Sequence, residues 1–238
     1  MATALSFPDY RFAPNIGANP GTYQLENRAV DRAGHVLAAM RALAPWHGQT
    51  LVDLGCGTGY WLPKYASSAE SVIGIEPDPA LRAVARRSAT SLQRTVVVAG
   101  SAEHMPLAQA TVDVVHARFA YFFPPGTDAG LAEVLRILRP GGHLVAVDND
   151  YRWGDFAGLL AASATRQPAQ TARAVDRWWL DRRASRHEVR SELRFASRDE
   201  LAAVLHIEFP ASVAAEWLRR NPRAAGLTYG FVVFVVQA

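Results

Sequence analysis

The chain has 238 residues, half of them hydrophobic and a fifth charged, which is enough to bury the core of one large domain or two small ones. No apolar run approaches the roughly 18 residues that a membrane-spanning helix needs, and the N-terminus lacks the positive start and apolar centre of a signal peptide. Cys56 is the single cysteine, which excludes intramolecular disulfides and cysteine-cluster metal sites, and the cytoplasm is the expected location.

The net charge of +3 comes from a basic excess in the C-terminal third of the chain. A nucleic-acid-binding protein usually carries a denser basic patch with interleaved aromatic residues. We therefore interpret these arginines as parts of solvated helix faces. An RNA-binding role for the arginines between residues 166 and 198 stays open as an alternative.

Short apolar runs alternate with amphipathic segments, after an irregular segment over residues 1–22. The predicted helices cover residues 23–43, 60–67, 78–88, 131–138, 155–184 with a break near Pro168, 197–205 and 210–220. The predicted strands cover residues 50–54, 71–76, 95–99, 111–117, 143–148, 188–195 and 227–236. Pro140, Gly141 and Gly142 are expected to stop the helix before the fifth strand. The alternation predicts an α/β fold whose ligands bind at the carboxyl ends of the strands.

Residues 51–60 carry the most informative motif, Leu-Val-Asp-Leu-Gly-Cys-Gly-Thr-Gly-Tyr. An apolar strand with Asp53 near its end leads into three glycines. Their backbone can approach a ligand closely, because glycine has no Cβ and tolerates positive φ. Tyr60 stands where a dinucleotide fingerprint requires glycine, which disfavours an NAD-dependent oxidoreductase.

This stretch resembles the nucleotide-binding loop of class I S-adenosylmethionine (SAM) methyltransferases of the UbiE-like, small-molecule type. The segment Leu-Arg-Ile-Leu-Arg-Pro-Gly-Gly-His-Leu at residues 135–144 is similar to the turn before strand five in that family. The resemblance covers residues 48–150 well. It implies a Rossmann-like, doubly wound sheet of seven strands, mostly parallel, with an antiparallel last strand.

The resemblance also implies SAM as the cofactor and S-adenosylhomocysteine (SAH) as its product. Glu76 ends the second strand, where an acidic side chain can accept both ribose hydroxyls of an adenosine. Ala102 and Glu103 are implied to border the adenine, and Arg118 to meet the methionine carboxylate. The residues expected to bind SAM are Tyr23, Asp53, Gly55, Cys56, Gly57, Gly59, Glu76, Pro77, Ser101, Ala102, Glu103, His116 and Arg118.

A single domain over residues 1–238 is predicted. Its parts are an N-terminal lid and helix (1–45), a SAM-binding core (46–150), a helical insertion after strand five (151–186) and the C-terminal part of the sheet (187–238). The side chains expected to fold over the cofactor are Tyr10, Phe12, Ile16 and Tyr23. The aromatic residues that suggest an apolar substrate pocket are Trp153, Phe156, Trp178 and Trp179. Packing of the last two onto the sheet is the competing interpretation.

The resemblance implies in-line transfer from the sulfonium to a nucleophile, for which the protein mainly supplies proximity and alignment. Tyr121 and Asp150 are the candidate catalytic residues, which would orient or deprotonate the acceptor. The favoured interpretation of the run Asp148-Asn149-Asp150 is a loop with self-capping side chains, and the run lacks the spacing of a calcium loop, so no metal is expected.

The expected partner is a small-molecule methyl acceptor, with no nucleic acid and no membrane, and the chain is expected to be a monomer or a homodimer. Methylation at oxygen, nitrogen or carbon stays open. A catalytically silent SAM-binding partner protein is the alternative from a different functional class.

Overall fold

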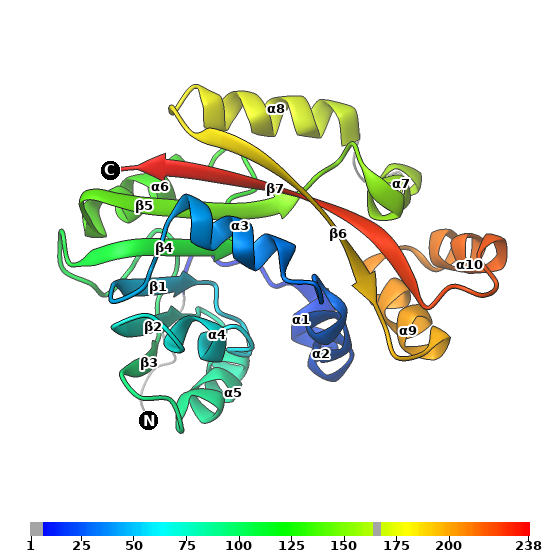
Figure 1. Cartoon of the computed structure of the whole chain (residues 1–238), viewed down its shortest axis with the longest axis horizontal. Coiled ribbons are helices and arrows are strands. Elements are labelled where there is room, and N and C mark those ends of the chain that lie inside the picture. The colour runs from blue at the N-terminus through cyan, green and yellow to red at the C-terminus, as the bar shows by residue number, and fades with distance from the viewer. Residues whose placement is uncertain (1–6, 164–167) are drawn as a thin grey trace.

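A seven-stranded sheet forms the centre of the computed structural model, which describes residues 7–163 and 168–238 (Figure 1). The strand order is β3-β2-β1-β4-β5-β7-β6, and β7 alone runs antiparallel to the other six strands. The strands are β1 (Thr50–Leu54), β2 (Ser71–Ile75), β3 (Thr95–Val98), β4 (Val112–Arg118), β5 (Leu138–Asn149), β6 (Ser185–Arg194) and β7 (Gly226–Gln237). The predicted topology is confirmed.

Helices cover both faces of this sheet. They are α1 (Pro14–Ala18), α2 (Pro20–Ala29), α3 (His35–Leu43), α4 (Leu62–Ala66), α5 (Pro79–Ala89), α6 (Asp128–Ile137), α7 (Gly154–Ala162), α8 (Pro168–Leu180), α9 (Arg198–Glu208) and α10 (Ala211–Arg220). Side chains alternate between the two faces of a strand, so Leu51 and the adjacent Val52 belong to separate hydrophobic cores. No helix of the described residues is both long and apolar enough to cross a membrane.

The segment 23–43, predicted as one helix, forms two helices. The chain turns between them, where Asp31 and Gly34 have positive φ values of 50° and 77°. The Asp31 carboxylate accepts hydrogen bonds from the backbone N–H of Val36 and the hydroxyl of Ser191, at 2.9 and 2.7 Å. The prediction was wrong because the apolar periodicity runs on through the turn, while the carboxylate satisfies donors at the start of α3. Helix α1 lies within the segment predicted to be irregular.

The turn before β5 also differs from the prediction. Helix α6 ends at Ile137 and the strand begins at once with Leu138, so the Pro-Gly-Gly turn lies inside β5. The pairing of β4 with β5 shifts there, from Val112 opposite Leu138 to Val114 opposite His143. The extra residues of β5 are accommodated as an irregularity of the strand, which a local turn signal does not indicate.

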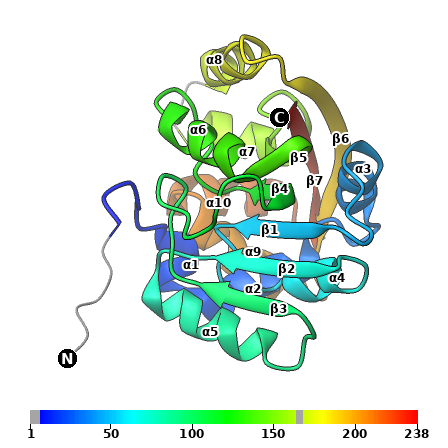
Figure 2. The same ribbon diagram turned by 90° about the vertical axis from the view of Figure 1, so that its left-hand side faces the viewer.

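The elements that build the candidate site meet at one end of the sheet. Figure 1 shows α1, α2 and α9 together at the end toward which β1 and β5 point. Figure 2 shows β1, β2 and β3 side by side, with α5 next to β3. The carboxyl ends of the parallel strands therefore face these N-terminal and C-terminal helices, as expected for a ligand site of an α/β fold.

Candidate functional site

Three glycines follow β1 directly. Gly55, Gly57 and Gly59 have φ values of 70°, 56° and 77°. A Cβ atom on Gly55 would lie 2.5 Å from the Cβ of Ala120, and one on Gly59 would lie 3.1 Å from the Cα of Ala85. The loop therefore requires glycine at these positions, both for its left-handed backbone and for its close packing.

Glu76 ties this loop to the carboxyl end of β2. Its Oε2 accepts a hydrogen bond from Gly57 N at 2.8 Å, and its Oε1 accepts one from Asp78 N at 2.9 Å. Glu76 is 4% exposed, and burial raises its pKa although both backbone hydrogen bonds lower it. Each oxygen keeps a second lone pair, so the carboxylate can still accept two hydroxyl groups. This geometry allows the predicted ribose contact. Pro77 follows Glu76 directly, and its carbonyl accepts a hydrogen bond from Arg82 at 2.8 Å.

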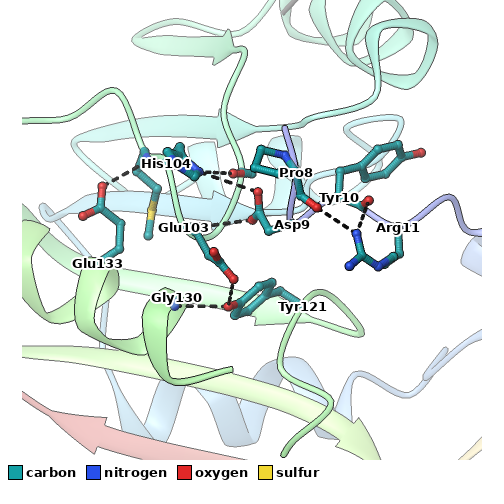
Figure 3. Close-up of polar contacts among 11 residues, drawn as sticks. Pro8, Asp9, Tyr10, Arg11, Glu103, His104, Tyr121, Gly130 and Glu133 are labelled. Carbon is teal, nitrogen blue, oxygen red and sulfur yellow. Dashed lines mark hydrogen bonds and ion pairs between the residues drawn. The ribbon is translucent and has the colours of Figure 1, made fainter. Parts of the chain in front are cut away.

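The N-terminal segment crosses the ends of β2 and β3, and Figure 3 shows residues 8–11 against the loop of Glu103 and His104. Asp9 Oδ2 accepts a hydrogen bond from Glu103 N at 3.2 Å, and His104 Nδ1 lies 3.7 Å from Asp9 Oδ1. The Tyr10 hydroxyl donates to Asp78 Oδ2 at 2.9 Å. These contacts hold the segment, which we call the strap (residues 8–12), over the loop predicted to meet the adenine. Ser101 and Ala102 of that loop are buried.

A cavity of about 670 Å³ adjoins the glycine loop. This volume lies within the range of small-molecule sites. Six of the residues predicted to bind SAM line it: Tyr23, Asp53, Gly55, Cys56, Gly57 and Arg118. Phe12 and Ile16, two of the expected lid residues, line it as well.

The cavity wall carries two opposite charges beside the loop. Asp53 is 4% exposed, and burial raises its pKa to about 7 against the lowering effect of Arg118. The guanidinium carbon of Arg118 lies 3.4 Å from the ring centroid of Trp61. Its Nε and Nη1 atoms are buried and have no hydrogen-bond partner among the described residues. An acid and an unsatisfied guanidinium in one wall match the ammonium and carboxylate of an amino acid.

The opposite part of the wall is aromatic. The rings of Phe156 on α7 and Tyr229 on β7 stack with their centroids 4.0 Å apart, and Phe209 packs edge-on against Phe156 at 5.0 Å. The Tyr229 hydroxyl donates to Asn149 Oδ1 at 2.5 Å. Of these rings only Phe156 was predicted to form the pocket.

Two carboxyl groups, from Glu26 on α2 and Glu208 on α9, also line this cavity. Sequence reasoning missed both, because they lie on helices near opposite ends of the chain and belong to no motif.

His116 was predicted to bind SAM, but the structure does not bring it to the cavity. Its ring is fully buried between Trp46 and Tyr65, at centroid distances of 5.0 and 4.9 Å. Burial lowers its pKa to about 3, and Arg118 adds to this effect. His116 and Arg118 share one face of β4, but His116 lies further from the strand end, underneath the packed aromatic rings.

The two predicted catalytic residues also lie off the cavity. The Tyr121 hydroxyl donates to Glu103 Oε1 at 2.7 Å and accepts from Gly130 N at 3.1 Å (Figure 3). Asp150 is 6% exposed, and its Oδ1 accepts a hydrogen bond from Arg152 N at 3.0 Å. Tyr121 is therefore held at the adenine end, and Asp150 fits the self-capping interpretation.

Trp178 and Trp179 pack onto the sheet, as the competing interpretation had it. Trp179 is fully buried and stacks on Phe234 of β7, with their centroids 5.2 Å apart. Trp153 lies under the guanidinium of Arg190 and does not line the cavity.

Among the described residues, no group of three His, Cys, Asp or Glu side chains is arranged to hold a metal ion.

Comparison with known proteins agrees with this architecture. Residues 52–146 match the family described as "Methyltransferase domain". An uncharacterized methyltransferase of Mycobacterium tuberculosis is 35% identical over 135 residues, covering 57% of this chain and 52% of the relative. A demethylmenaquinone methyltransferase of Thermobifida fusca is 33% identical over 134 residues, covering 51% and 57%. The chain thus spans about half the length of the curated relatives it matches.

The fold is similar to that of a SAM-dependent methyltransferase from Aquifex aeolicus. The TM-score is 0.54 at 15% sequence identity, and the similarity covers 94% of this chain and 98% of the other.

Proposed function

We propose that the class I methyltransferase domain of this chain transfers the methyl group of SAM to a small, largely apolar acceptor. The observation that carries the proposal is the pair of opposite charges, Asp53 and Arg118, in the cavity wall beside the glycine loop. A dinucleotide offers no amino-acid group to such a pair, whereas SAM ends in one. The family match over residues 52–146 supports the same cofactor.

The residues present suit SAM at both of its ends. Arg118 would hold the methionine carboxylate and Asp53 the ammonium, because each charge is opposite to that of the group it meets, Asp53 is buried and two nitrogens of Arg118 are buried without a partner among the described residues. Glu76 would accept the ribose hydroxyls, and the loop of Ser101, Ala102 and Glu103 would border the adenine. When bound, SAM supplies an electrophilic methyl group on a sulfonium.

The protein's own contribution is alignment. Holding two reactants in line can recover on the order of 7–11 kcal/mol of a barrier. Phe156, Phe209 and Tyr229 would position a flat, apolar acceptor in the same cavity. The strap and α1 would close over it from the N-terminal side.

Nothing in the described surface favours the RNA alternative. Arg186 pairs with Asp176 at 2.9 Å, Arg194 with Glu192 at 2.8 Å, and Arg182 with Asp128. These ion pairs partly neutralise the arginines that were considered for phosphate binding.

Thermal unfolding with three ligands tests the proposal. SAM and SAH should each raise the melting temperature, because a ligand at a hundred times its Kd stabilises the native state by about 2.7 kcal/mol. NAD at the same concentration should leave it unchanged. A rise with NAD and none with SAM or SAH would contradict the proposal, and full SAM binding without turnover of any acceptor would favour a silent partner protein.

A further inference from the structure

Two carboxyl groups face each other in the aromatic part of the cavity wall. Glu26, on α2, is 9% exposed, and Glu208 ends α9. The two groups lie close enough for Glu208 to raise the pKa of Glu26, and Asn15 Nδ2 donates to Glu208 Oε1 at 2.8 Å. Two buried carboxylates side by side disfavour each other's ionised form, so this arrangement favours a proton on one of them.

No positive charge is bound to this pair. In the parts of the chain that the structure describes, neither carboxyl group forms an ion pair with lysine or arginine. Asn15 of α1 is bound to the pair, both carboxyl groups act electrostatically on Tyr23 of α2 and Tyr229 of β7, and the further charges that act on these two tyrosines are Arg118 of β4 and Asp148 of β5. Arg118 is the one cation of this set, and it stacks on Trp61. Burial raises the pKa of both glutamates, and Glu208 raises that of Glu26 further.

Both side chains line the cavity, and one of their oxygens lacks a donor in the described part of the chain. Oε2 of Glu26 is buried, yet no N–H or O–H donor of the described residues reaches it. A buried acceptor atom without a donor costs about 1–3 kcal/mol, so a cavity wall that presents one suits a ligand that supplies the hydrogen. The glycine loop and the aromatic rings line the same cavity.

We propose that Glu26 and Glu208 form the proton-accepting subsite for the methyl acceptor, which is therefore an aromatic small molecule with a neutral O–H or N–H group. This inference rests on the proposed function. The pair, which holds one proton between its two carboxyl groups, accepts a hydrogen bond from the nucleophile and has room for one more proton. An acceptor that presents a carboxylate at this point would be repelled.

The reaction balances with the groups present. A bond forms between the acceptor's oxygen or nitrogen and the methyl carbon, and the carbon–sulfur bond breaks with its electron pair going to sulfur. The proton of the O–H or N–H group passes to the carboxylate of the pair, which becomes doubly protonated. One proton returns to water when the product leaves.

Infrared spectroscopy tests whether a proton is shared. At a pH well above 7, where Asp53 is ionised, the free protein should still show a carboxyl C=O band, and this band should disappear in Glu26→Gln and in Glu208→Gln. Glu216→Gln, on α10, is the matched control because Glu216 is bound to exposed arginines and should leave the band unchanged. Absence of the band from the wild-type protein would overturn the proposal.

Three probes with one ring system test the acceptor class: naphthol, naphthylamine and naphthoate, titrated into the SAH-bound protein. Naphthol and naphthylamine should bind at least about tenfold more tightly than naphthoate, a difference that the variants should remove. With SAM, turnover of naphthol should fall by roughly 10²–10⁴-fold in Glu26→Gln. Tighter binding of naphthoate, or unchanged turnover in both variants, would overturn this inference alone. Failure of SAH to bind would overturn the proposed function and this inference together.

Discussion

Asp53 and Arg118 are the opposite charges of the cavity wall beside the glycine loop. Of the two, Asp53 changes its ionisation near neutral pH. Burial holds the pKa of Asp53 at about 7, with Arg118 lowering it and Glu76 raising it. Only the ionised form can pair with an ammonium group. The protonation of this single residue should therefore control how tightly an amino-acid group is held.

The affinity for SAH should accordingly rise by roughly tenfold between about pH 6 and about pH 8, as Asp53 loses its proton. Asp53→Asn should bind SAH more weakly at the upper pH and show a flat profile over this range. Isothermal titration calorimetry at several pH values measures both. A wild-type profile as flat as that of the variant would rule out this role of Asp53.

His116 illustrates how a residue at a strand end can belong to the core. Its ring nitrogens are buried and have no hydrogen-bond partner among the described residues, and burial lowers its pKa from 6.5 to about 3. The folded protein therefore keeps this ring neutral at pH values at which the unfolded chain takes up a proton. Stability from this group is full above about pH 6.5 and is lost as the pH falls toward 3.

Replacing His116 by leucine should remove this acid sensitivity. Relative to the wild type, His116→Leu should gain roughly 1.4 kcal/mol of unfolding free energy for each pH unit below about 6.5. Urea denaturation at pH values on both sides of this point measures the gain. His206→Gln, at an exposed position of α9, is the control. Parallel pH curves for His116→Leu and the wild type would show that the buried ring does not titrate as inferred.

At the scale of elements, the strap and the helices α1 and α2 form the N-terminal cover of the site. Asp9 and Tyr10 attach the strap to the loops after β3 and β2. Ile16 and Tyr23 reach the cavity from α1 and α2. The same segment thus touches both the proposed adenine end and the proposed acceptor end of the site, so ligand binding and the order of this cover should be coupled.

We expect SAH to protect residues 8–28 from proteolysis. Trypsin can cut in this segment after Arg11 and Arg28, and cutting should slow several-fold with SAH, while cutting after the exposed Arg94 should not change. A variant with Asp9→Ala and Tyr10→Phe, which loses both strap contacts, should be cut faster without ligand. Equal cutting rates with and without SAH would contradict the coupling.

Elements were predicted well where one local pattern decides them. The alternation of apolar runs placed every strand of the sheet, and Ser197 caps α9 as expected, accepting a hydrogen bond from Glu200 N at 3.2 Å. The turn between α2 and α3 was missed because Asp31 replaces the helical hydrogen bonds with its side chain, using Ser191 of β6 as a further partner. The local sequence around Asp31 does not indicate a contact with a residue so distant in the chain.

At the scale of the whole molecule, the cofactor half of the site and the acceptor half have different origins. The glycine loop, Asp53 and Glu76 lie within one continuous stretch of the chain and could be predicted from its motifs. The acceptor half combines Glu26, Phe156, Glu208 and Tyr229. These residues come together because β7 pairs antiparallel with β5 and because α2 packs on α9. Their residue types follow no spacing, so the fold had to be known first.

Calorimetric titration of SAH into the wild-type chain and into Arg118→Gln tests the central claim most directly, because Arg118 is the cation whose buried nitrogens, unpartnered among the described residues, the proposed cofactor would satisfy. We expect one SAH to bind per wild-type chain and the variant to bind at least about tenfold more weakly, a loss of about 1.4 kcal/mol. Arg219→Gln, on the exposed face of α10, should match the wild type. No heat of binding with the wild-type chain, or equal affinity in Arg118→Gln, would contradict the assignment of this cavity to SAM.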